Sequence, residues 1–114
     1  MNTEEILPKS VIVHIDRFSL SKDLQLEALE EFKELCLSSG TSVSAEVSGK
    51  IDRPSPNFFV RHGKLEEIKA LVKDHKANLV IFNNDLTPSQ ERNLEKFLGT
   101  RVLDRTSLIL DIFA

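Results

Sequence analysis

The chain has 114 residues, a hydrophobic fraction of 40% and a formal net charge of −3. This length allows one domain with its own hydrophobic core and excludes a second full domain. No apolar run approaches the roughly 20 residues that cross a bilayer. The first residues include Glu4 and Glu5, where a secretion signal would be basic. The negative net charge argues against indiscriminate nucleic-acid binding. We therefore expect a cytoplasmic protein with no membrane span and no DNA partner.

Hydrophobic patterning predicts strand, helix and strand in the first half of the chain. Residues 11–15 are nearly all apolar and β-branched, which is typical of a central strand buried on both faces. Residues 24–37 repeat apolar side chains at helical spacing, with Cys36 on the apolar stripe, and Gly40 supplies a stop. Residues 43–47 alternate valine or alanine with polar side chains, which predicts a strand at the edge of the sheet.

The second half repeats this alternation. Pro54 and Pro56 predict a loop over residues 49–57, after which residues 58–60 are an optional short strand. Residues 64–75 have helical periodicity and residues 79–82 form an apolar strand. Thr87, Pro88 and Gln90 make a capping box that begins a helix ending at Gly99, and residues 102–103 form a last short strand.

This order predicts an α/β fold, with a small, mostly parallel four-stranded sheet and helices on both of its faces. Residues 108–113 are apolar except for Asp111, and the sequence stops one residue later. The pattern predicts the beginning of a truncated carboxyl-terminal helix, and a tail packed back on the sheet is a compatible alternative.

Charge is unevenly distributed. Residues 50–64 contain four cations against Asp52 alone, a local net charge of +3 on an acidic domain. This segment is the best candidate for contact with a polyanion, and a flexible solvated loop is the alternative. The four cations are Lys50, Arg53, Arg61 and Lys64.

The motifs of common catalytic and metal sites are missing from the sequence. No G-x-x-x-x-G-K-[ST] run exists to bind nucleoside triphosphate and magnesium, and three scattered histidines with one cysteine make no metal cluster. We expect His14 and Cys36 to be buried core residues. Asp16, Asp85 and Asp104 follow predicted strands, where they favour capping and turn formation over catalysis.

From Arg53 onward the sequence resembles the amino-terminal region of the HflX GTPases. The shared features are a set of short blocks followed by two long ones that run without gaps. The blocks are Arg53-Pro54 with Phe59-Val60, residues 63–68, residues 79–82, residues 86–95 (LTPSQERNLE) and residues 101–114 (RVLDRTSLILDIFA).

The resemblance implies a non-catalytic domain, residues 1–104, followed from residue 105 by the start of a helical segment that leads to a helical pair and a GTPase domain. It implies binding of the large ribosomal subunit and its RNA, a role in splitting or rescuing stalled ribosomes under stress, and regulation of the GTPase. GTP and magnesium would belong to the GTPase domain, and this chain would hold no cofactor.

Two sets of candidate residues follow. The RNA- and ribosome-binding candidates are the four cations of residues 50–64 together with Arg92 and Arg105. The alternative is an adenine-nucleotide site at Gly63, Lys64, Asn84 and Asp85, since ATP binding is associated with this region in some family members. Arg61 replaces the first glycine of the family's Gly-x-Gly-Lys pattern, which favours RNA contact over nucleotide binding. The block at Asp104 and Arg105 is alternatively a structural junction, with the aspartate capping the next helix.

Overall fold

The computed structural model describes residues 7–113, in which strands and helices alternate without interruption. The strands are β1 (Lys9–Asp16), β2 (Ser42–Lys50), β3 (Leu79–Phe82) and β4 (Arg101–Leu103). The helices are α1 (Lys22–Ser38), α2 (His62–His75), α3 (Pro88–Leu98) and α4 (Arg105–Phe113). The predicted α/β fold with four strands is therefore confirmed.

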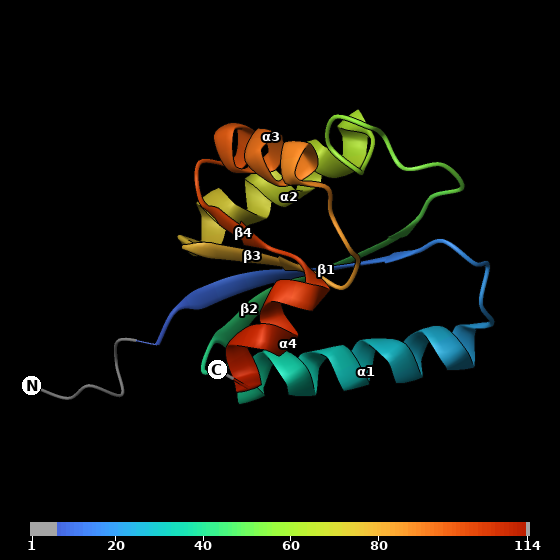
Figure 1. Cartoon of the computed structure of the whole chain (residues 1–114), viewed down its shortest axis with the longest axis horizontal. Helices are drawn as coiled ribbons and strands as arrows, with labels where there is room; N and C mark the ends of the chain where they lie inside the picture. The colour runs from blue at the N-terminus through green and yellow to red at the C-terminus, as the bar shows by residue number, and fades with distance from the viewer. Residues whose placement is uncertain (1–6, 114) are drawn as a thin grey trace, which may run out of the picture.

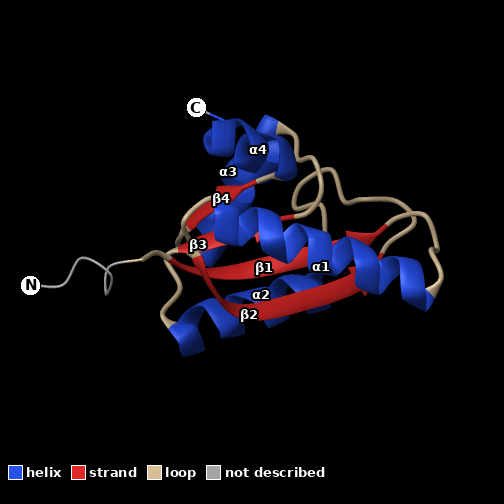
Figure 2. Ribbon diagram, turned by 90° about the horizontal axis from the view of Figure 1, so that it is seen from below, coloured by secondary structure: helices blue, strands red, loops and turns tan. Residues whose placement is uncertain are grey.

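All four strands are parallel, in the order β2-β1-β3-β4. Helices α2 and α3 cover one face of the sheet, and α1 and α4 cover the other (Figure 1; Figure 2 shows α1 lying across the sheet). The chain moves from β1 outward to β2, and α2 then brings it back across β1 to β3. The direction of winding thus changes between β1 and β3, and open α/β sheets bind ligands where it does so.

The strands form because each is a short apolar run that two helical layers bury. In β1, every residue after Lys9 is buried, and β3 is buried throughout. Alternate residues of β1 enter different cores: Val11, Val13 and Ile15 pack with α2 and α3, whereas Ile12 packs with Phe32 of α1. Strand β2 lies at one edge of the sheet and has one fully buried residue, Val47, as its alternating pattern predicts.

The helix boundaries follow the capping chemistry of the sequence. The Thr87 hydroxyl accepts a hydrogen bond from Gln90 N at 3.1 Å, and Thr87 N donates to Gln90 Oε1 at 2.8 Å, so the predicted capping box is confirmed. Gly99 ends α3 at φ 70°, a left-handed conformation that glycine adopts without strain. Helix α1 begins at Lys22 because Ser21 caps it, slightly earlier than its periodicity predicts.

Two local expectations are corrected. Residues 58–60 form no strand: Phe59 makes only an isolated antiparallel bridge with Ser55 and has a φ of 66°. The loop predicted from residue 49 begins at Ile51, because Gly49 and Lys50 continue β2 beside β1. Proline at positions 54 and 56 removes ladder donors only after that point.

Helix α4 packs against α1 and β3, and Leu108 is fully buried in the core on that face. The predicted carboxyl-terminal helix is therefore confirmed, and it packs back on the sheet as the compatible alternative predicted. Glu4 and Glu5 lie outside the described residues, as does Ala114 at the end of the last matching block. Within residues 7–113, no helix is both long and apolar enough to cross a membrane.

Candidate functional site at the carboxyl edge of the sheet

The predicted site residues come mainly from loops at one edge of the sheet. Parallel strands end together, so the segments that follow β1, β2 and β3 meet at this carboxyl edge. These segments contain residues 17–20, 51–61 and 83–87. Among the hollows that they line, one is basic and another has mixed aromatic and basic walls.

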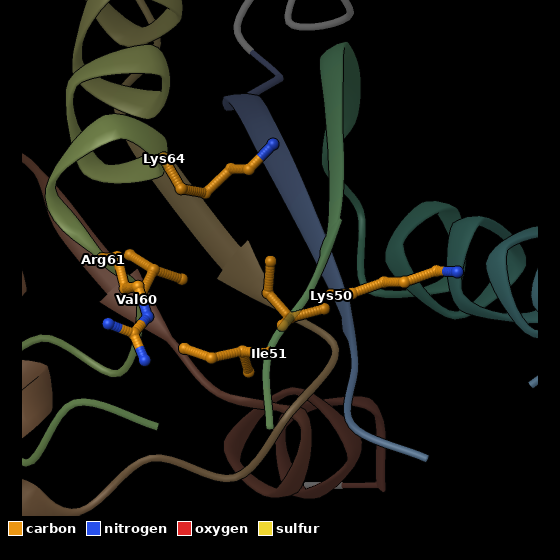
Figure 3. Close-up of a pocket in the computed structure, with 6 residues that line it drawn as sticks. Lys50, Ile51, Val60, Arg61 and Lys64 are labelled. Carbon is orange, nitrogen blue, oxygen red and sulfur yellow. The ribbon is translucent and has the colours of Figure 1, made fainter. Parts of the chain in front are cut away.

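The basic hollow measures about 250 Å³ and is lined by Lys50, Ile51, Asp52 and Arg61. Lys50 and Arg61 are exposed, and within residues 7–113 neither forms an ion pair. Lys64 joins them around a smaller adjoining cavity of about 60 Å³. Figure 3 shows the charged ends of the three side chains pointing apart, so they form a spread of positive charge and no single pocket for one small anion.

Lys64 is the most constrained of the predicted cations. Its stem lies over Gly49, where an added Cβ would come within 3.0 Å of Lys64 Cε. Its amine donates to Ser48 O at 2.8 Å and to Glu67 Oε1 at 2.9 Å. These contacts leave Lys64 less able to bind a ligand than Lys50 or Arg61.

Arg61 occupies the cap position of α2 with φ −84° and ψ 170°, ordinary extended backbone for any residue. The glycine of the family pattern is thus not required for the conformation of this loop. Arg53 is exposed within the loop, and Arg92 is exposed on α3. The side chain of Asn93 donates to Asn57 O at 3.0 Å, which ties α3 to the loop that carries Arg53.

The second hollow, which we call the switch-point crevice, measures about 240 Å³ and lies where β1 and β3 end. Its lining includes Asn84 and Asp85, which we predicted for the nucleotide alternative, and Arg105, which we predicted as an RNA contact. Arg17 and Phe18 also line it and were not among the predicted site residues. The signal for the missed pair was an aromatic residue beside an arginine in the loop directly after the central strand. Phe59 and Asn83 complete the lining.

The polar side chains of the crevice are engaged in holding the fold. Asn84 donates to Ile15 O at 2.9 Å and accepts from Ile15 N at 3.3 Å, so its amide continues the ladder between β1 and β3. Asp85 Oδ1 accepts from the Thr106 hydroxyl at 2.7 Å. Asn84 and Asp85 both line this crevice, but Lys64 and Gly63 do not, so the four residues of the nucleotide alternative are not brought together around it.

The structural role expected of Asp104 and Arg105 is confirmed. Asp104 Oδ1 accepts from Ser107 N at 2.9 Å and caps α4, while its Oδ2 accepts from Leu86 N at 3.1 Å. The Arg105 guanidinium donates to Asn83 Oδ1 at 2.7 Å and to Glu31 Oε1 at 3.2 Å. Arg105 therefore joins α4 to α1 and has only its remaining N–H groups to offer to a ligand.

His14 is buried as expected, and its hydrogen bonding determines its protonation. Arg105 can only donate, so it orients the Asn83 amide with its oxygen toward the guanidinium and its nitrogen toward His14 Nδ1, 2.9 Å away. His14 Nδ1 must then accept, which places the proton on Nε2, a buried atom with no partner within the described chain. Burial lowers the pKa of His14, and the nearby charge of Asp16 opposes that shift.

Cys36 is buried in the core beneath α1. Burial raises the pKa of its thiol to about 12, which makes it a structural residue and a poor nucleophile. Within residues 7–113, no group of three or more histidine, cysteine, aspartate or glutamate side chains is arranged to hold a metal ion.

Comparison with known proteins identifies the family. Residues 26–114 match the family model described as GTP-binding GTPase N-terminal. The chain is 43% identical over 106 residues to the GTPase HflX of Escherichia coli, a match that covers 93% of this chain and 24% of the relative. The chain belongs to the HflX amino-terminal domain family. The HflX of Flavobacterium psychrophilum is 40% identical over the same length, which covers 26% of that relative.

Solved structures agree with this HflX-type fold. A GTP-binding protein from Sulfolobus solfataricus, solved in complex with GDP, superposes with a TM-score of 0.64 at 25% identity, covering 93% of this chain and 30% of that one. A G235P variant of the protein named SsGBP superposes with a TM-score of 0.68 at 24% identity, covering 93% of this chain and 32% of that one. The chain spans about a quarter of the length of the HflX relatives named above.

Proposed function

We propose that this chain is a non-catalytic domain that contributes RNA contacts when an HflX-type GTPase binds the large ribosomal subunit. In this proposal the domain also regulates the GTPase and takes part in splitting or rescuing stalled ribosomes under stress. GTP hydrolysis belongs to a GTPase domain elsewhere in the full-length protein, reached through the helical segment that α4 begins. Family membership and the absence of a P-loop motif from this sequence support assigning RNA contacts to this domain and GTP hydrolysis to the GTPase domain.

The observation that carries the RNA contact is the unpaired basic surface around the basic hollow. Lys50 and Arg61 line it, Arg53 lies in the same loop, and none of the three forms an ion pair within residues 7–113. Their charged ends spread over the surface, which suits successive phosphates of a backbone better than one small anion. Arg92 and Arg105 are secondary contacts in this proposal. Lys64 has a structural role in it, because its amine already donates hydrogen bonds to Ser48 O and Glu67 Oε1.

The test is co-sedimentation of the 114-residue chain with purified large ribosomal subunits at two salt concentrations. We expect the double variant Lys50→Glu with Arg61→Glu to bind more weakly. The slope of log affinity against log salt should also become less steep, by roughly one to two in magnitude. The control is Lys73→Glu with Lys96→Glu, the same charge change in the last turns of α2 and α3, at the opposite edge of the sheet. Equal binding by both variants and the wild type would refute the proposed surface.

An adenine-nucleotide site has less support, because the side chains of Lys64 and Asn84 already have partners. Calorimetry with ATP at millimolar concentration separates the two proposals. A measurable heat that survives Lys50→Glu with Arg61→Glu would favour a nucleotide site distinct from the basic surface.

A further inference from the structure

Phe18 is an exposed aromatic residue on a loop that the fold holds in place. It is 79% exposed and follows directly on the central strand β1, at the mouth of the switch-point crevice. The core gains nothing from this position, since a phenylalanine in water forgoes the hydrophobic stabilisation that burial would give. A surface aromatic held in this way therefore points to a partner.

Asp16 holds the loop in place. Its side chain is buried, and it accepts from Phe18 N at 3.0 Å, from Leu20 N at 3.0 Å and from Gln25 Nε2 at 3.2 Å. Ser19, between the two backbone donors, has a φ of 54°. Because Phe18 is tethered through its own N–H to the end of β1, the backbone that carries its ring has little conformational entropy left to lose on binding.

The surroundings of Phe18 favour a nucleic-acid base over an apolar partner. Arg17 precedes it, lines the same crevice and forms no ion pair within residues 7–113. Arg105 and the ring of Phe59 also line the crevice, and Asp85 is the acidic residue there. Phe59 is only 3% exposed and stacks edge-to-face on Phe82, so it is a rigid wall.

We propose that Phe18 is a stacking platform for an unpaired RNA base, with Arg17 bound to a neighbouring phosphate. Single-stranded RNA is commonly recognised by aromatic side chains that stack on splayed-out bases beside cations that bind the backbone. The crevice and the basic hollow both lie at the carboxyl edge of the sheet, and a hydrogen bond links their walls: Ile51 N of the basic hollow donates to Asp16 O, next to Arg17 of the crevice, at 3.0 Å. This inference rests on the proposed function and names the feature of the RNA that the domain recognises.

The test compares an eight-nucleotide adenine RNA with a duplex RNA of equal length, using fluorescence anisotropy and the 114-residue chain. We expect the wild type to prefer the single strand. Phe18→Ala should weaken single-strand binding on the order of 5- to 150-fold, the range for loss of one base–aromatic stack, and leave duplex binding and the salt dependence unchanged. Phe18→Leu should behave like Phe18→Ala, because leucine is apolar but has no π face. Phe113→Ala, at a residue 83% exposed at the end of α4, is the matched control and should change nothing.

Three results would overturn the inference. The first is a Phe18→Leu variant that binds as the wild type does, which would indicate apolar packing of the kind a protein partner makes. The second is a Phe18→Ala variant with unchanged single-strand affinity. If that variant also binds large subunits normally while Lys50→Glu with Arg61→Glu does not, the proposed function stands and only the stacking role fails. The third is a wild-type protein that binds neither RNA nor large subunits, a result that would refute both the stacking role of Phe18 and the proposed function.

Discussion

Replacing Asp104 by alanine should destabilise this domain, because its side chain joins two separate segments of the carboxyl edge. The buried carboxylate satisfies two backbone donors from different segments: Ser107 N in the first turn of α4 and Leu86 N in the loop after β3. Losing a helix cap costs about 1 kcal/mol, and leaving a partly buried N–H unpaired costs about 1–3 kcal/mol. We therefore expect the free energy of unfolding to fall by about 3 kcal/mol, or roughly 10–20 °C in Tm for a domain of this size.

Urea denaturation followed by circular dichroism measures this loss, with Asp104→Asn as the matched control. Asparagine keeps one acceptor oxygen, so it should retain one of the two hydrogen bonds and lose about half as much. The charge of Asp104 also helps raise the pKa of Glu91, although burial of the Glu91 carboxyl is the larger cause. In Asp104→Ala the pKa of Glu91 should move back toward its ordinary value. A loss of stability below about 0.5 kcal/mol for alanine would show that the two segments are held together in some other way.

Two further predictions concern buried titratable side chains. Because burial lowers the pKa of His14 below its ordinary value of 6.5, its neutral form stabilises the fold fully above pH 6.5, and this contribution is lost as pH falls from 6.5 through the lowered pKa. The free energy of unfolding measured between pH 7.5 and 5 should therefore decline less in His14→Gln than in the wild type, and an equal decline in the two proteins would contradict this reasoning. With its thiol pKa raised to about 12 by burial, Cys36 should react with iodoacetamide at pH 8 only as fast as the chain unfolds, and rapid labelling of the native protein would contradict its buried position.

Much of the fold could be predicted because the deciding interactions are local in sequence. The capping box from Thr87 to Gln90 and the positive φ of Gly99 depend on residues within one or two turns. The edge position of β2 follows from its alternating pattern, which leaves one face in water. Asp104 was recognisable as a cap because aspartate is a favoured N-cap residue, and its side chain accepts a hydrogen bond from Ser107 N in the first turn of α4.

The candidate site was harder to predict because its side chains form hydrogen bonds with residues that are far away in the sequence. Asn84 bonds to Ile15, 69 positions earlier, and Arg105 bonds to Glu31, 74 positions earlier. No periodicity reports such contacts, since they depend on how the crossovers bring strand ends together. Lys64 was predicted as a free cation, yet its long stem reaches back over Gly49 to β2. The exposure of Phe18 likewise depends on the loop geometry that Asp16 imposes.

The net charge of −3 belongs to the whole chain and does not describe the charge at the carboxyl edge of the sheet. The hydrogen bonds of the aspartates at this edge explain the difference. Both oxygens of Asp16 and of Asp104, and Oδ1 of Asp85, accept hydrogen bonds from backbone N–H groups, a side-chain amide and a hydroxyl. They are therefore not paired with the cations of the same edge, Arg17, Lys50 and Arg61. Helices α1 to α4 each follow a strand and so begin at this edge, where the positive ends of their dipoles add to the cations. An acidic domain can in this way present a surface for phosphate, and its RNA affinity should depend on the local cations and salt, with little influence from acidic residues placed at the opposite edge.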